Sequence, residues 1–179
     1  MGFLLQAIMA VGVVFLVACN TPSSGEFVLY DFETDEELNR LHWHCHTLYS
    51  LSDQYGTHGL RSLKMELFPS DYPGLDTILQ DRDWTNFSFL GIDIYNPEQE
   101  EIVISIRIDD KNNPDYNDRY NKKFFIKPGL NRLSVSLNRL YTSDRTRTLN
   151  LETIRKFLLF IPHPQKKVVL YVDYIRLMA

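Results

Sequence analysis

Four polar side chains occupy alternating positions in two neighbouring strand-like segments near the middle of the chain. Asp93 and Tyr95 alternate with apolar residues in the first segment, and Arg107 and Asp109 alternate with isoleucines in the second. Because successive side chains of a strand point to opposite faces, each segment has one apolar face and one mixed face. An arginine can donate to two hydroxyls at once, and a tyrosine ring can cover an apolar ligand face. We expect any ligand site, for a sugar above all, to begin on this mixed face.

The loop after the second segment and the last strand-like segment carry further candidates. Residues 109–120 read DDKNNPDYNDRY, in which Tyr116, Arg119 and Tyr120 flank the mixed face, and Tyr171 lies in the last segment. Binding residues favour loops on a rigid scaffold, so we expect these side chains to extend the site. The alternative is a solvated loop with Arg119 paired to an acid and a sheet face with Arg107 in a cross-strand ion pair.

The segments that position these residues favour an all-β fold. The link 96–100 contains turn residues and no apolar side chain, so we predict that segments 89–95 and 102–109 form one hairpin. The apolar face of that hairpin requires a second sheet to cover it, which predicts a β-sandwich. About nine short strands with turn signals between them are expected in a single domain. The expected strands include one over 43–51, and the type of segment 75–83 is left open.

Composition and charge exclude several classes of function. The chain has 179 residues, 44% of them hydrophobic and 23% charged, with a formal net charge of −4. The cations are scattered rather than clustered, which argues against a nucleic-acid partner. No nucleophile elbow, phosphate-binding glycine loop or metalloprotease motif is present, so we do not expect an enzyme.

The first 25 residues are typical of an export and attachment signal. Residues 3–18 are apolar except for Gln6, and the run is shorter than the roughly 20 residues of a membrane-spanning helix. It ends in Leu-Val-Ala-Cys, which resembles the lipobox of bacterial lipoproteins. That resemblance implies a signal peptide with a helical apolar region at 1–18, a lipidated Cys19 on a polar tether to residue 25, and a domain at 26–179. We expect membrane attachment in the cell envelope; an uncleaved anchor helix is the alternative.

The order of the motifs within the domain resembles a known family of folds. The motifs are YDFE at 30–33, HGLRSLKM at 58–65, DWTNF at 83–87, DIYNP at 93–97, RIDD at 107–110, DRYNK at 118–122, KPGLN at 127–131, TLNLETI at 148–154 and YVDYIRL at 171–177. Together they are similar to the galactose-binding-domain-like jelly rolls of bacterial carbohydrate-binding modules associated with glycoside hydrolases. The resemblance implies a jelly-roll sandwich of two antiparallel sheets.

The resemblance also implies a ligand and an ion. By analogy, the chain is a membrane-anchored module that binds a glycan or an envelope polysaccharide; the alternative is a structural lipoprotein that binds an envelope protein. Modules of this kind often hold a structural calcium ion between the first and last strands, at places that Glu33 and Asp173 match. Calcium requires six to eight oxygen ligands, which loop carbonyls near residues 56–58 could complete. The alternative is that both carboxylates only cap backbone groups.

A histidine-rich segment raises a second metal hypothesis. His42, His44 and His46 alternate along one expected strand, so their rings would share a face. Imidazoles in this arrangement could bind zinc or copper. The alternative is a partly exposed strand whose histidines make ordinary hydrogen bonds, because no downstream cluster completes a ligand set.

Overall fold

The domain is a sandwich of two antiparallel sheets, as the alternating segments and the family resemblance predict. The computed structural model describes residues 25–42 and 45–179. The signal peptide, Cys19 and His44 therefore lie outside the described residues. The strands are β1 (Glu26–Tyr30), β2 (Leu41–His42), β3 (Thr47–Ser52), β4 (Ser62–Leu67), β5 (Gly74–Thr77), β6 (Phe89–Asn96), β7 (Ile102–Asp109), β8 (Tyr120–Ile126), β9 (Gly129–Ser136), β10 (Lys156–Phe160) and β11 (Val168–Met178).

Short 3₁₀ helices occur only in the connections between the described strands. They are η1 (Asp35–Arg40), η2 (Tyr116–Asp118), η3 (Leu137–Arg139) and η4 (Leu151–Thr153). Asn150 caps η4, because its side chain accepts a hydrogen bond from the Glu152 amide, as its residue type favours. Within the described residues, no helix has the length and apolar character needed to cross a membrane.

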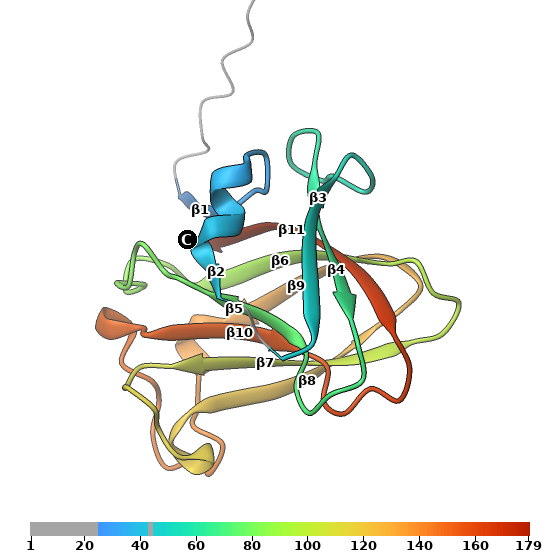
Figure 1. Ribbon diagram of the computed structural model, residues 1–179. Coiled ribbons are helices and arrows are strands. Elements are labelled where there is room, and N and C mark those ends of the chain that lie inside the picture. Colours follow the sequence, from blue (N-terminus) through green and yellow to red (C-terminus); the bar gives the residue numbers. More distant parts are fainter. Residues whose placement is uncertain (1–24, 43–44) are drawn as a thin grey trace, which may run out of the picture.

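The two sheets have unequal strand counts and lie face to face (Figure 1). The six-stranded sheet has the order β3-β4-β11-β6-β9, with β1 also paired to β11. The five-stranded sheet, which we call sheet B, has the order β2-β5-β10-β7-β8. β11 is the longest strand and pairs with β4, β6 and β1, so it organises the six-stranded sheet.

The core fills the space between the sheets with side chains from alternate strand positions. These residues are fully buried: Leu63, Met65 and Leu67 from β4, Leu90, Ile92 and Ile94 from β6, and Ile104, Ile106 and Ile108 from β7. A period of two in each strand thus gives each sheet one inner face. The polar residues of the same strands then lie on the outer faces, which are the surfaces that can hold a site.

The predicted hairpin between residues 89 and 109 is wrong. β6 pairs with β11 and β9, whereas β7 pairs with β10 and β8, so the two strands belong to different sheets. Their apolar faces meet across the core instead of lying side by side. Asn96 fixes the link between them, because its Nδ2 donates to the backbone oxygens of Ile126 and Glu100 at 3.0 and 2.9 Å. The buried Asn96 therefore marks an arch between sheets rather than a turn within one.

The strand expected over residues 43–51 is also interrupted. β2 joins the five-stranded sheet, and β3 joins the six-stranded sheet. Cys45, between them, has a φ of 48°, in the left-handed region that does not continue a strand. The segment 75–83, whose type the sequence leaves open, contributes β5, so the described residues form eleven strands rather than about nine.

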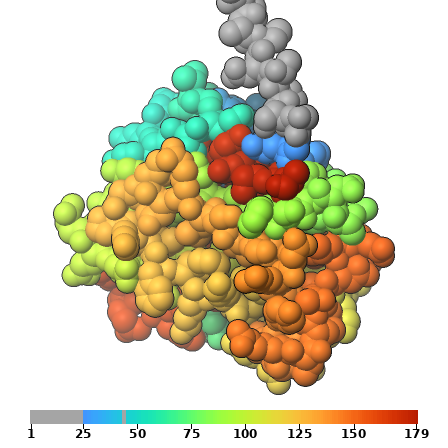
Figure 2. Space-filling view, turned by 180° about the vertical axis from the view of Figure 1, so that it is seen from behind, coloured from blue at the N-terminus to red at the C-terminus, as the bar shows by residue number. Residues whose placement is uncertain are grey.

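The two ends of the domain lie together on the six-stranded sheet. β1 pairs with the end of β11, and the Ala179 amide donates to the Gly25 oxygen at 2.7 Å. In the view from behind, the last residues (red) lie directly beside the first described strand (blue) (Figure 2). The chain that precedes Gly25 therefore joins the domain at this sheet.

Candidate functional site

The outer face of the five-stranded sheet is hollowed at two neighbouring places. One row of outward side chains crosses four strands, because Leu158 of β10 is opposite Asp76 of β5 and Arg107 of β7, and Arg107 is opposite Asn121 of β8. Hollows of about 420 and 330 Å³ lie along this face. Arg107 lines the smaller hollow and its ion-pair partner Asp109 lines the larger one, so the two hollows are neighbours on this face, and we treat them together as one groove. We call it the sheet-B groove.

The smaller hollow combines aromatic rings with cations. Its lining residues are Tyr72, Ser105, Arg107, Tyr116, Arg119, Asn121, Lys123, Leu158, Phe160, Pro162 and His163. The rings of Tyr72 and Phe160 pack edge to face with centroids 5.6 Å apart, and the Tyr72 and His163 centroids are 5.1 Å apart. This arrangement offers an apolar surface for stacking beside groups that donate hydrogen bonds.

Arg107 is held in a fixed orientation by Asp109. Its Nη2 lies 2.6 Å from Oδ2 of Asp109, and its Nε lies 2.9 Å from Oδ1. The Asp109 side chain is 1% exposed, so a buried carboxylate binds the guanidinium through two of its nitrogens. The pair positions Arg107 at the junction of the two hollows and neutralises its charge.

Arg119 has no comparable partner among the described residues. Its guanidinium carbon lies 5.4 Å from the Tyr116 ring centre, and its Nε is buried without a hydrogen-bond acceptor. Burial, and then the positive charge of Arg107, lower the pKa of Arg119 from its ordinary value. Arg119 is therefore a partly buried cation of the smaller hollow that no described carboxylate pairs with.

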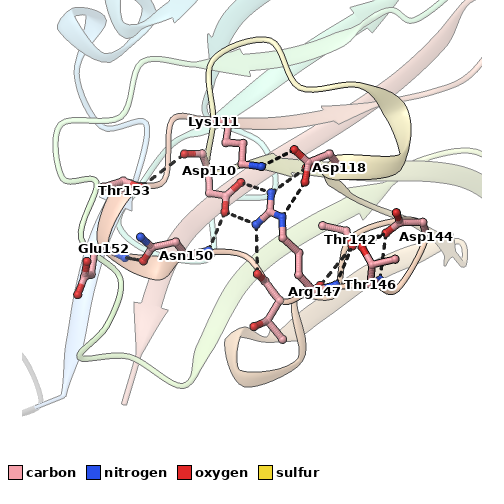
Figure 3. Close-up of polar contacts among 11 residues, drawn as sticks. Asp110, Lys111, Asp118, Thr142, Asp144, Thr146, Arg147, Asn150, Glu152 and Thr153 are labelled. Atoms are coloured by element: carbon pink, nitrogen blue, oxygen red, sulfur yellow. Dashed lines mark hydrogen bonds and ion pairs between the residues drawn. The ribbon is translucent and has the colours of Figure 1, made fainter.

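The loop that carries Tyr116 and Arg119 is tied to a second loop by Arg147 (Figure 3). Two Arg147 nitrogens bind Asp110, with Nη1 2.6 Å from Oδ2 and Nη2 2.9 Å from Oδ1. Its Nε lies 2.6 Å from Oδ1 of Asp118, within η2. Because one guanidinium joins both ends of residues 110–118, it fixes the wall of the groove that Tyr116 forms.

The carboxylates of this network are stabilised in their charged form. Asp110 also accepts the backbone amide of Asn150 at 2.7 Å, and Asp118 accepts Nζ of Lys111 at 2.6 Å. Burial opposes ionisation of Asp110, but the hydrogen bonds from Arg147 and Asn150 outweigh it and hold the pKa of Asp110 below its usual value. Hydrogen bonds from Arg147 and Lys111 lower the pKa of Asp118 as well. Both acids therefore remain charged at neutral pH.

The larger hollow contains charges of both signs. Asp76 is buried, with Oδ2 3.0 Å from Nζ of Lys156 and Oδ1 without a hydrogen-bond partner in the described structure. Asp109, Lys111 and Arg155 also line this hollow. This end of the groove can both donate and accept hydrogen bonds.

The structure divides the predicted ligand residues between two surfaces. Arg107, Asp109, Tyr116 and Arg119 come together at the sheet-B groove. The remaining strand residues, Asp93, Tyr95 and Tyr171, belong to β6 and β11 of the six-stranded sheet. The prediction that all of them share one face is wrong, because β6 and β7 face each other across the core and their outward residues point in opposite directions.

The residues on the six-stranded sheet are occupied by their own neighbours. Asp93 receives Nη1 of Arg176 at 3.1 Å and lies 3.6 Å from Nε of Arg132. The Tyr95 ring is stacked on Tyr55 with centroids 3.6 Å apart. These groups satisfy one another.

Tyr120 lies mainly in the core and does not line the sheet-B groove. Its side chain is 7% exposed and packs in the core, and burial raises its pKa to about 12. In β8 it is opposite Ile108, an inward residue, so it points away from the groove. Tyr120 instead borders a separate hollow of about 540 Å³ that Tyr141 and Arg145 also line, and its assignment as a ligand residue stays a prediction.

Sequence reasoning missed several residues of the groove. Tyr72 and His163 lie in turns, where no periodicity predicts a direction. Phe160 ends β10, whose sequence KFLLF is apolar at four successive positions and so predicts no outward face. In β5, the alternation of Asp76 with the buried Leu75 was a signal that Asp76 points outward.

Glu33 and Asp173 both hold the loop of residues 57–61. Asp173 Oδ2 accepts the backbone amides of Thr57 and His58 at 2.6 and 2.9 Å, and Glu33 Oε1 accepts the amide of Arg61 at 2.7 Å. Burial raises the pKa of Asp173, against the effect of these hydrogen bonds. A calcium ion would compete with amide donors for the same oxygens, so the contacts resemble backbone capping more than a prepared cation site. The calcium site stays a prediction.

The histidines of the other metal hypothesis are separated where they can be placed. His42 ends β2 in the five-stranded sheet, and His46 precedes β3 in the six-stranded sheet. Across residues 25–42 and 45–179, no three histidine, cysteine, aspartate or glutamate residues gather into a group that could hold a metal ion.

Comparisons with known proteins identify similar folds. No protein-family model matches the chain, and no curated protein matches its sequence. A family 11 carbohydrate-binding module from Clostridium thermocellum, in complex with a beta-1,3-1,4-mixed-linked tetrasaccharide, is similar with a TM-score of 0.65 and 21% identity. That match covers 87% of this chain and 96% of the module.

Two further solved structures have the same architecture. An exo-beta-agarase matches with a TM-score of 0.67 and 20% identity, over 84% of this chain but only 24% of the agarase. A xylan-binding domain of family 22 matches with a TM-score of 0.56 and 10% identity, over 88% of this chain and 97% of that domain. At these identities the likeness establishes the jelly-roll fold of carbohydrate-binding modules.

Proposed function

We propose that this domain is a non-catalytic carbohydrate-binding module and that the sheet-B groove holds the glycan. The observation that carries the proposal is the smaller hollow, where the rings of Tyr72, Phe160 and Tyr116 border the guanidinium of Arg119. Sugars have apolar ring faces and polar edges, which this combination matches. The similar solved modules, including one that holds a mixed-linked tetrasaccharide, support the class of ligand.

Recognition would divide between stacking and hydrogen bonding. A pyranose ring would lie against the aromatic wall, while Arg107 and Arg119 donate to its hydroxyls. Arg107 is fixed by Asp109, and the Tyr116 loop is fixed by Arg147, so little ordering would be needed on binding. Two neighbouring hollows suit a chain of several sugar units better than a monosaccharide.

The test is a calorimetric and affinity-gel comparison of the purified protein with mixed-linked β-glucan, xylan, agarose and polygalacturonate. Tyr116→Ala should weaken binding by about 1 kcal/mol, or about fivefold in Kd, the usual value of an aromatic contact. Tyr141→Ala is the matched control, since Tyr141 is 48% exposed and lies outside the groove. Equal Kd values for the two variants would place the binding surface elsewhere, and no binding to any polysaccharide would refute the function.

We further propose that the module is anchored to a bacterial membrane through lipidated Cys19. The Leu-Val-Ala-Cys motif at the end of the apolar run supports this proposal. Gly25 joins the six-stranded sheet through β1, so a tether from that sheet leaves the groove on the outer face of the opposite sheet. The protein would then hold glycan at the cell envelope.

Acyl labelling tests the anchor. We expect labelled fatty acid to be incorporated into the wild-type protein and into Cys45→Ser, but not into Cys19→Ser. Cys45 is the suitable control because it is a free thiol within the described domain. Labelling that persists in Cys19→Ser would exclude this mode of attachment.

A further inference from the structure

The smaller hollow of the sheet-B groove is unusually cationic. Arg119 and Lys123, which form no ion pair with a described residue, line it together with His163 and the Asp109-paired Arg107, and its described lining includes no aspartate or glutamate. The chain as a whole has a formal net charge of −4, so this concentration of positive charge opposes the balance of the molecule. The nearest acid to His163 is the exposed Asp71, at 3.7 Å.

Asp109 pairs with Arg107 and with no other described arginine that lines this hollow. Asp109 binds Arg107 through both oxygens, at 2.9 Å to Nε and 2.6 Å to Nη2. Arg119 forms no ion pair with any described residue, and its buried Nε has no acceptor. Arg119 therefore has no ion-pair partner of its own inside the hollow.

An uncompensated, partly buried guanidinium is unfavourable unless an anion completes it. Removing a cation from water costs free energy that only a partner charge or a full set of hydrogen bonds restores. Neutral sugar hydroxyls would accept hydrogen bonds from the guanidinium donors but would provide no opposite charge. A carboxylate or sulfate would satisfy both, and the planar guanidinium fork matches such groups through two parallel hydrogen bonds.

We propose that the smaller hollow selects an anionic sugar unit, a uronate or a sulfated sugar, whose charged group binds Arg119 while its ring stacks on the aromatic wall. This inference rests on the proposed function and specifies its ligand. Lys123, exposed at the rim, adds long-range attraction for a polyanion. The larger hollow contains Asp76 and Asp109 beside its cations, so the preference belongs to one end of the groove.

The test compares charged and neutral polysaccharides on the same protein. Binding of polygalacturonate, sulfated galactan and neutral mixed-linked β-glucan is measured by calorimetry at low and high salt. We expect wild-type protein to bind a charged polysaccharide at least tenfold more tightly than the neutral one, with an affinity that falls as salt rises. The two charged probes separate a carboxylate from a sulfate ligand.

Two substitutions at one position and one matched control isolate Arg119. Arg119→Gln should lose tenfold or more in affinity for the charged polysaccharide, and Arg119→Lys should lose less, because it keeps the charge without the fork. Arg132→Gln removes the same charge from the outer face of the opposite sheet and should leave binding unchanged. Asp93, the ion-pair partner of Arg132, still pairs with Arg176 in this variant. If Arg119→Gln and Arg132→Gln lose the same affinity for the charged polysaccharide, the loss is an effect of net charge and the proposal is overturned.

Melting temperature distinguishes recognition from a structural role. Arg119→Gln removes an uncompensated cation, so the free protein should melt at the same temperature or higher. A lower melting temperature, with loss of binding to every polysaccharide, would make Arg119 structural and overturn the inference. Tight binding of β-glucan without preference for either charged probe would overturn the inference alone, whereas binding of none of the three would remove the proposed function with it.

Discussion

Substitution of Arg147 by alanine should destabilise the domain and loosen the wall of the groove. Arg147 is the only described cation that joins Asp110 to Asp118, through contacts of 2.6 Å to each (Figure 3). The Asp110 side chain is 2% exposed. After the substitution, the chief remaining partner of its charge is the backbone amide of Asn150.

The expected loss follows from the burial of each partner. Removing one member of a fully buried ion pair costs about 3–5 kcal/mol, because the other charge stays in place without compensation. The Arg147 side chain is 29% exposed and the Asn150 amide remains, so we expect about 2–3 kcal/mol of unfolding free energy to be lost. For a domain of this size, that corresponds to a melting temperature lower by about 4–12 °C.

Urea unfolding and thermal melting of Arg147→Ala measure this loss. Asp118→Asn is the comparison, since it removes the more exposed carboxylate and should cost clearly less. Asp110→Asn combined with Arg147→Ala should restore part of the stability, because no charge then remains buried alone. A loss below about 1 kcal/mol in Arg147→Ala would refute the reasoning, since that is the value of an exposed pair.

Two further predictions concern ions and pH. If Glu33 and Asp173 hold calcium, a hundredfold excess over its Kd should add about 2.7 kcal/mol to the folded state, whereas identical melting curves in calcium and in chelator would remove the site. The pKa values of Asp110 and Asp118 are lowered on folding, so their contribution is present above about pH 4 and is lost as the pH falls through the folded-state values. Stability of the wild type should therefore fall more steeply in acid than that of Arg147→Ala, and parallel curves would count against the network.

Alternation predicted the faces of the strands but not their neighbours. Ile92 and Ile106 are both inward, as their positions in period-two segments require. The same pattern fits two strands paired in one sheet and two strands facing each other across a core, since each arrangement buries both apolar faces. The buried Asn96, which donates to a carbonyl of β8, is the feature that distinguishes an arch from a hairpin, and its role depends on contacts distant in the chain.

The same limit explains which groove residues sequence reasoning could find. Arg107 and Asp109 are neighbours through alternation, and Tyr116 and Arg119 follow in the next loop, so local order places the four together. Phe160 and Tyr72 reach them only because β10 lies between β7 and β5. Sheet order is decided by the packing of the whole chain, which periodicity within a segment does not describe.

The two outer faces differ in how completely their charges are satisfied, and this difference favours the five-stranded sheet as the binding face. On the six-stranded sheet, Asp93 has two arginine partners, and Tyr95 is covered by the ring of Tyr55. On the five-stranded sheet, Asp109 pairs with Arg107 alone among the described arginines, which leaves Arg119 with a buried Nε that has no acceptor, beside the aromatic rings of the smaller hollow. In a folded chain, buried polar groups generally form hydrogen bonds with other residues or with water. A buried donor that has no acceptor within a groove, such as Nε of Arg119, therefore indicates where a ligand could supply that acceptor.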